Sequence, residues 1–78
     1  MPITYRSSVA AEVRAEMARQ GLAQRDAALR CGWAQQYISR RLTDQTAFSL
    51  DDLEQLARAL GVPVGQFVNP PSRTNEAA

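Results

Sequence analysis

Residues 24–43, QRDAALRCGWAQQYISRRLT, decide the fold of this chain of 78 residues. Apolar side chains recur at helical spacing on both sides of Gly32. They are Ala27, Ala28 and Cys31 before the glycine, and Ile38 and Leu42 after it. Glycine enters the left-handed backbone region without a Cβ penalty, and it is the commonest residue just beyond a helix end. The stretch therefore predicts two short helices, at about 24–31 and 34–42, joined by a tight turn.

This pair of helices and the residues around it resemble a known family. Residues 21–68 are similar to the lambda-repressor-like DNA-binding domain of Cro and repressor proteins, also called the Xre type. The shared features are an opening Gly-Leu-x-Gln, Ala28, the turn at Gly32, Ile38 and a late Leu-Ala-x-Ala-Leu-Gly-Val. The run Tyr-Ile-Ser-Arg-Arg-Leu also resembles small actinobacterial and actinophage repressors. The resemblance implies an all-α fold of five helices. Its helix-turn-helix lies at the second and third helices, and the third enters a DNA groove.

The chain around the motif predicts one domain with loose ends, because 78 residues suffice for one domain only. Ser8 is expected to cap a first helix at 9–20, and residues 1–7 before it form an N-terminal arm. Residues 69–78 have the composition of a flexible tail, which leaves 8–68 as the folded DNA-binding domain.

Two further helices are predicted after the motif. Ser49 and Asp52 have the spacing of an acidic capping box, which opens a helix at 50–60. Pro63 is expected to open a short last helix at 63–68, since proline is favoured at the first helical position.

Several positions depart from the pattern of the family. Ala23 and Ala34 stand at N-cap positions where Ser or Thr is usual, a loss of about 1 kcal/mol of capping at Ala23. Asp44 stands where glycine is frequent, and Asp tolerates the left-handed region less readily. Met17 and Leu42 occupy positions where some lambdoid repressors bury an Arg–Glu pair, so an apolar contact is expected to replace an ion pair.

Charge is unevenly distributed, although the net charge is only +1. Residues 1–43 hold seven Arg against three acidic residues, whereas residues 44–78 hold two Arg against five. The basic half therefore contains the helix-turn-helix. All nine basic residues are Arg, whose planar fork suits phosphates and guanine edges. A GC-rich genome, which favours Arg codons, is an equally good explanation for the lack of Lys.

Composition excludes several classes of function. The chain has one Cys and no His, so an internal disulfide is impossible, and neither a zinc site nor His-based catalysis is expected. No acid–base pair, metal cluster or Gly-rich phosphate loop is visible, so neither an enzyme nor a cofactor is predicted. The sequence lacks an apolar run near 18 residues and an apolar leader, which favours a cytoplasmic protein without a membrane partner.

The second helix of the motif carries the predicted base-reading residues. Gln35 and Gln36 lie in its first turn, and glutamine can bond bidentately to adenine N6 and N7. The alternative is a pair of ordinary solvated glutamines. Arg40 lies one turn beyond Gln36, within reach of guanine or a phosphate, and all three are expected on the outer side of the helix. Tyr37 and Ser39 flank them, although Tyr37 is as readily explained as part of the scaffold.

Other residues are assigned by the resemblance or by position. The resemblance implies a phosphate contact for Gln24, and Arg25 beside it can add a second. Arg41 is also predicted to reach DNA, although it stands where the family usually buries an apolar residue, so its stem is expected to snorkel. Cys31 falls on the apolar face of its helix and is predicted to be a buried thiol. Arg14, on the first helix, is expected to lie away from DNA.

Together with the resemblance, these residues predict a transcriptional regulator that binds a specific operator in double-stranded DNA as a repressor, of the phage-immunity or Xre type. A homodimer on a palindrome is expected, with contacts from the last helix and the residues after it. The apolar residues available there are Val62, Val64, Phe67 and Val68. The alternative is a protein-interaction module such as an antitoxin, whose main partner is a protein. The basic first half favours DNA.

Overall fold

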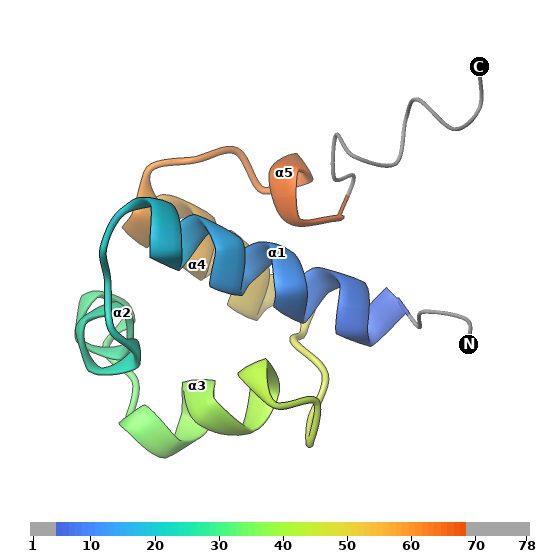
Figure 1. Ribbon diagram of the computed structural model, residues 1–78, viewed down its shortest axis with the longest axis horizontal. Helices are drawn as coiled ribbons and strands as arrows, with labels where there is room; N and C mark the ends of the chain where they lie inside the picture. Colours follow the sequence, from blue (N-terminus) through green and yellow to red (C-terminus); the bar gives the residue numbers. More distant parts are fainter. Residues whose placement is uncertain (1–4, 69–78) are drawn as a thin grey trace.

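The computed structural model describes residues 5–68, and within that range the chain forms five helices and no strand (Figure 1). In chain order they are α1 (Tyr5–Arg19), α2 (Gln24–Cys31), α3 (Gln35–Leu42), α4 (Leu50–Leu60) and α5 (Gly65–Val68). The all-α, five-helix fold predicted from the sequence is confirmed. The predicted tail at 69–78 and the first four residues of the predicted arm lie outside the described range.

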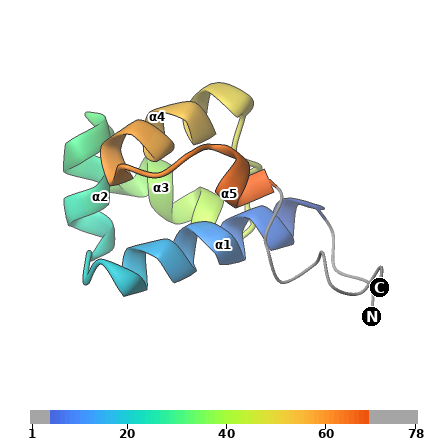
Figure 2. The ribbon, with the colours of Figure 1, turned by 90° about the horizontal axis from the view of Figure 1, so that it is seen from above.

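The five helices share one core, through which α1 runs. α1 contacts α3 and α5, whereas α2 contacts α3 and α4. Figures 1 and 2 show α2 at one end of the molecule, where the remaining long helices converge on it. Four helices supply the largest fully buried side chains, which are Val13, Ile38, Leu56 and Phe67. The buried side of the helix-turn-helix therefore packs against both α1 and α4.

Local end signals place α2 and α4 at the boundaries predicted from the sequence. Gly32 and Gly61 follow these helices with φ of 74° and 73°, in the left-handed region that favours glycine. At the start of α4, the Asp52 amide donates to the Ser49 hydroxyl at 3.0 Å, and the Ser49 amide donates to the Asp52 carboxylate at 2.9 Å. The predicted capping box is thus confirmed.

The start of α1 differs from the prediction. The helix begins at Tyr5, so Ser8 lies inside it and is not its N-cap, and part of the predicted arm is helical. Val9 and Ala10 are buried by the fold, and the Ser7 hydroxyl donates to the Asp44 carboxylate at 3.0 Å. These tertiary contacts favour an extra turn of helix, whereas the capping preference of serine at position 8 is only a local signal.

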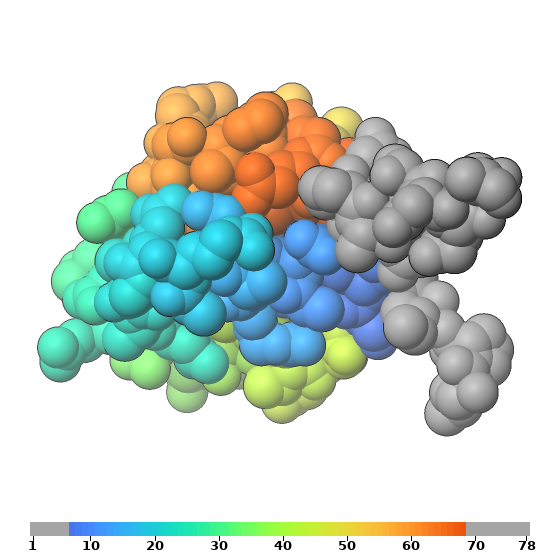
Figure 3. Space-filling view, turned by 45° about the horizontal axis from the view of Figure 1, so that its top comes forward, coloured from blue at the N-terminus to red at the C-terminus, as the bar shows by residue number. Residues whose placement is uncertain are grey.

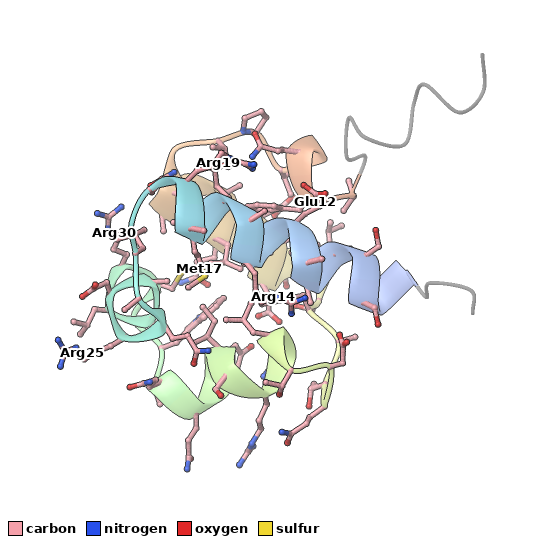
Figure 4. The ribbon with its side chains drawn as sticks, in the orientation of Figure 1. Glu12, Arg14, Met17, Arg19, Arg25 and Arg30 are labelled. Carbon is pink, nitrogen blue, oxygen red and sulfur yellow. The ribbon has the colours of Figure 1, made fainter. Side chains whose placement is uncertain are left out.

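The expected left-handed residue and the expected apolar pair are both present. Asp44 has φ of 67°, and among the described residues it is the one non-glycine in that region. Met17 and Leu42 are both buried in the core cluster, as the expected apolar contact requires. Figure 4 shows Met17 on the underside of α1, turned toward the interior.

The last helix is shorter than predicted and is part of the core. α5 begins at Gly65, and Pro63 precedes it, with its carbonyl accepting the Gln66 amide at 3.0 Å. Phe67 is completely buried, which corrects its prediction as a residue available for a partner. Val62, Val64 and Val68 are half-buried against the core. Figure 3 shows the residues of α5 packed against those of α1.

Candidate nucleic-acid interface

The turn between α2 and α3 is fixed by backbone hydrogen bonds and by α4. The Trp33 amide donates to the Ala28 carbonyl at 2.8 Å, just beyond the left-handed Gly32. The Gln55 side chain of α4 donates to the Cys31 carbonyl at 2.7 Å, which satisfies a carbonyl at the end of α2. The angle between the two helices is therefore set by a residue outside the motif as well as by the glycine.

α3 presents its apolar side inward and an open polar side outward. Ile38 and Leu42 are buried, whereas Gln36 and Arg40 are exposed on the opposite side. Gln35 is exposed too, but at about 100° per residue it projects about 100° away from Gln36, toward the flank of Leu42. The predicted outer face is thus a row of two residues, with Gln35 beside it in the first turn.

Tyr37 and Arg41 face α4 and are bound to Asp52. The Tyr37 hydroxyl donates to one carboxylate oxygen of Asp52 at 2.6 Å, and the Arg41 Nε donates to the other at 3.1 Å. The Arg41 guanidinium also donates to the Tyr37 carbonyl at 2.9 Å and lies 3.6 Å from the centre of the Tyr37 ring. The side chains of Arg41 and Asp52 are only 15% and 7% exposed. The predicted snorkelling of Arg41 is thus replaced by an internal ion pair.

Asp52, Tyr37 and Arg41 together form the Asp52 cluster. Their contacts shift the pKa values of its two acids, Asp52 and Tyr37. Burial opposes the ionisation of Asp52, but hydrogen bonds from Tyr37, Ser49 and Arg41 outweigh it and hold the Asp52 pKa below its ordinary value. The hydrogen bond to Asp52 raises the pKa of Tyr37, and burial adds to that effect. The cluster therefore holds a carboxylate anion, a neutral phenol and a guanidinium cation.

The remaining arginines fall into two groups by their partners. Arg14 donates to the Leu42 carbonyl at the end of α3, and Arg19 pairs with Glu16 at 2.8 Å. Within the described part of the chain, the side chains of Arg25, Arg30, Arg40 and Arg58 are exposed and make no hydrogen bond or ion pair with another residue. Figure 4 shows Arg25 and Arg30 pointing outward from α2, whereas Arg14 lies between α1 and α3.

The N-terminal ends of α2 and α3 have no side-chain cap. Ala23 and Ala34 adopt the extended N-cap conformation but offer no oxygen to the first amides. The Ala23 amide itself donates to Asp26 at 3.4 Å. Gln24 is half-buried at the first position of α2, and Arg25 follows it, exposed. The two helix ends in the motif thus retain unpaired amide donors, which favour an anion.

Sequence reasoning found the exposed residues of the motif but missed its supports. The bonds of Arg14 and Gln55 to helix-end carbonyls had no signal in the sequence, because each joins residues more than 20 positions apart. Asp52 was identified as a cap, and its second role on α3 was missed. Cys31 is buried as predicted, and burial raises the pKa of its thiol.

A second polar cluster, remote from the motif, ties α1 to α4 and α5. Glu16 is buried and accepts hydrogen bonds from Arg19, Gln20 and Gln66, the last at 2.6 Å. Gln20 also donates to the Leu60 carbonyl at 2.8 Å. Hydrogen bonds from Gln20 and Arg19 hold the Glu16 pKa below its ordinary value, against the effect of burial. This cluster holds the helices together on the side away from α3.

Comparisons with known proteins agree with this geometry. The model of the helix-turn-helix family matches residues 13–67. A crystal structure described as a hypothetical transcription factor, NHTF, from Neisseria matches with a TM-score of 0.86 and 26% sequence identity, over 100% of this chain and 92% of that chain. No curated protein matches the chain.

Two other features are absent from the described residues. Residues 5–68 contain no group of three or more His, Cys, Asp and Glu that could hold a metal ion. None of the described helices has the length and apolarity needed to cross a membrane.

Proposed function

The chain belongs to the Cro- and repressor-type helix-turn-helix family, and from this premise we propose that it is a repressor that binds a specific operator in duplex DNA through α3. One observation carries the proposal. Gln36 and Arg40 form an outward row on the second helix of the motif, and neither side chain makes a hydrogen bond or ion pair with another described residue. Side chains of this kind can bond to adenine and guanine edges in the major groove.

The predicted contacts divide into base-reading and phosphate-binding residues. Gln36 and Arg40 are assigned to base edges because they form the outward row of α3, and Gln35, which is exposed beside that row in the first turn, is assigned with them. Gln24 and Arg25 are assigned to phosphates, since they stand at the uncapped start of α2. Ser39, half-buried on the flank of α3, is the third phosphate contact.

Tyr37 and Arg41 belonged to the set of DNA contacts predicted from the sequence. Their bonds to Asp52 support a different assignment, in which they hold α3 and do not touch DNA. The open positive charge that attracts phosphates then belongs to Arg25 and, in addition to its base contact, to Arg40, with Arg30 at the far end of α2 as a weaker contributor.

Two copies on a palindrome complete the proposal, because one module reads only a few base pairs. Half-sites would lie about one helical turn apart, roughly 34 Å. The apolar residues offered to a second copy are the half-buried Val62 and Val64, just before α5, and Val68 at its end, whereas Phe67 is buried.

The test is selection of bound sequences from a random duplex library, followed by a salt titration on the selected duplex. We expect an enriched motif and a negative slope of log K against log salt, with about −0.9 for each phosphate contact. Arg25→Ala should make the slope less steep by about one contact on selected and scrambled duplexes alike. Arg58→Ala on α4 is the matched control, because Arg58 is also exposed but lies outside the motif. No binding at low salt would instead favour a protein-interaction module such as an antitoxin.

A further inference from the structure

We propose that Asp52, which is buried on α4, is a positioning residue for base reading, because through Tyr37 and Arg41 it fixes the rotation of α3 about its own axis. This inference rests on the proposed function. Asp52 is 5% exposed, so it acts on DNA only through the residues that it holds.

The apolar contacts of α3 leave this rotation poorly determined. The helix has eight residues, or about two turns, and only Ile38 and Leu42 are buried from it. These two side chains are one turn apart on a single line along the helix. A helix seated on one line can rock to either side, so contacts away from the line must set its rotation.

The Asp52 cluster supplies such contacts on the side that faces α4. Tyr37 and Arg41 are one turn apart, and each binds a different oxygen of the same carboxylate, at 2.6 and 3.1 Å. Asp52 is in turn fixed to the α4 backbone, because the Ser49 amide donates to it at 2.9 Å. The carboxylate thus joins two successive turns of α3 to the capped N-terminal end of α4.

Members of the Asp52 cluster also bind one another, which limits the alternative arrangements of their side chains. Arg41 binds the Tyr37 carbonyl at 2.9 Å and covers the Tyr37 ring at 3.6 Å from its centre. Trp33 lies against the same ring, with 4.7 Å between ring centroids. From α1, which also contacts α3, Arg14 holds the Leu42 carbonyl at the end of α3. The rotation of α3 is therefore defined by both α1 and α4.

A small rotation is enough to disturb base reading. Side-chain tips lie about 6 Å from a helix axis, so a rotation of about 20° displaces them by about 2 Å. A hydrogen bond tolerates only about 0.5 Å of donor–acceptor distance, from about 2.7 to 3.2 Å. A bidentate contact from Gln36 or Arg40 would be broken, whereas nonspecific attraction to phosphates, which depends on charge, would remain.

The experiment compares variants that break the bonds of the Asp52 cluster with one variant that only weakens the cap at the start of α4. Asp52→Asn and Arg41→Lys disturb the bonds to α3, and Tyr37→Phe removes one hydroxyl only. Ser49→Ala is the control, because it removes the hydroxyl that caps the Asp52 amide but keeps the backbone amide that binds the carboxylate. Each variant is measured well below its melting temperature, against the duplex selected by the wild-type chain and a scrambled duplex.

We expect the ratio of the two affinities to fall about tenfold in Asp52→Asn and Arg41→Lys, the scale of one lost bidentate base contact. The ratio should fall less in Tyr37→Phe and stay at the wild-type value in Ser49→Ala, with scrambled-duplex affinity and its salt slope unchanged in all four. An unchanged ratio in Arg41→Lys and Tyr37→Phe overturns the inference, and so does an equal loss in Ser49→Ala. A wild-type chain that does not discriminate between the duplexes defeats the proposed function itself, which is a separate result.

Discussion

Arg40 and Arg41 are neighbours in the sequence, but the α-helix turns them to different sides of α3. Arg40 is exposed, and its guanidinium makes no hydrogen bond or ion pair with another described residue. Arg41 is mostly buried, pairs with Asp52 and stacks on Tyr37. The outer row of α3, Gln36 and Arg40, is open to a partner. The inner row, Tyr37 and Arg41, is bound to α4.

This difference shows that a count of basic residues overstates the charge available to a nucleic acid. Arg14 and Arg41, which contributed to the basic half of the sequence, are bound to a carbonyl and a carboxylate of the chain itself. Among the arginines whose side chains the structure describes, those that remain exposed without a partner are Arg25 and Arg30 on α2, Arg40 on α3 and Arg58 on α4. Electrostatic attraction should therefore follow the open arginines and not the net charge.

The largest expected effect is a difference in the free energy of unfolding between a variant of the inner row and a variant of the outer row. Arg41→Ala leaves the Asp52 carboxylate buried without its cation, and loss of one partner of a buried pair destabilises by about 3 kcal/mol. Arg40→Ala, at an exposed position, should change stability by less than about 0.5 kcal/mol. Urea denaturation of both variants, with midpoints compared at equal slope, measures the difference. Equal losses would mean that the two rows do not differ energetically.

Acid should lower the free energy of unfolding by less than Arg41→Ala does, because a protonated Asp52 can still accept a hydrogen bond. The Asp52 pKa is lower in the folded chain, so the unfolded chain binds more protons as pH falls. The stability from Asp52 is fully present above its unfolded pKa of about 3.9 and is lost as pH falls through the folded pKa. Denaturation midpoints from pH 7 to pH 3 should fall less in Asp52→Asn, which keeps the contribution of Glu16, whose pKa is also lowered. Parallel curves for the two chains would contradict this account.

A substitution in the outer row should have the opposite outcome: it should lower the specificity of DNA binding and leave folding stability unchanged. Gln36→Ala removes a side chain that can bond bidentately to a base, which is worth roughly 1–3 kcal/mol of discrimination. Affinity for the selected duplex should fall by that amount, while affinity for scrambled DNA and the melting curve stay near wild type. If both affinities fall together, Gln36 binds phosphates. If neither changes, it is a solvated glutamine.

The boundaries and caps of α2 and α4 could be predicted because their signals are local. Gly32, Gly61 and the pair Ser49–Asp52 act within one turn of the helix end that they define. The exposure of Gln36 and Arg40 followed from helical period alone. The function of Arg41 could not be predicted, since its partner is 11 positions away and lies on another helix. The early start of α1 likewise depends on a contact between Ser7 and Asp44, 37 positions apart.

The smallest effect concerns the start of α3, where neither row is changed. Ala34 is exposed and already has the extended N-cap conformation, with φ of −68° and ψ of 149°. Ala34→Ser therefore adds an acceptor for the first amides without moving the backbone, as Ser49 does on α4. Stability should rise by about 1 kcal/mol, which corresponds to roughly 4–8 °C in a domain of this size.

The same variant sharpens the comparison between the rows. If the Asp52 cluster and Arg14 fix the rotation of α3, a better cap strengthens the helix along its axis and leaves Gln36 and Arg40 where they were. Thermal melting should then shift upward, while the ratio of affinities for the selected and scrambled duplexes stays constant. A changed ratio would show that the first turn of α3, and not only its inner row, sets the direction of the base-reading side chains. A melting temperature that does not rise would show that the first amides of α3 gain nothing from a hydroxyl acceptor at position 34.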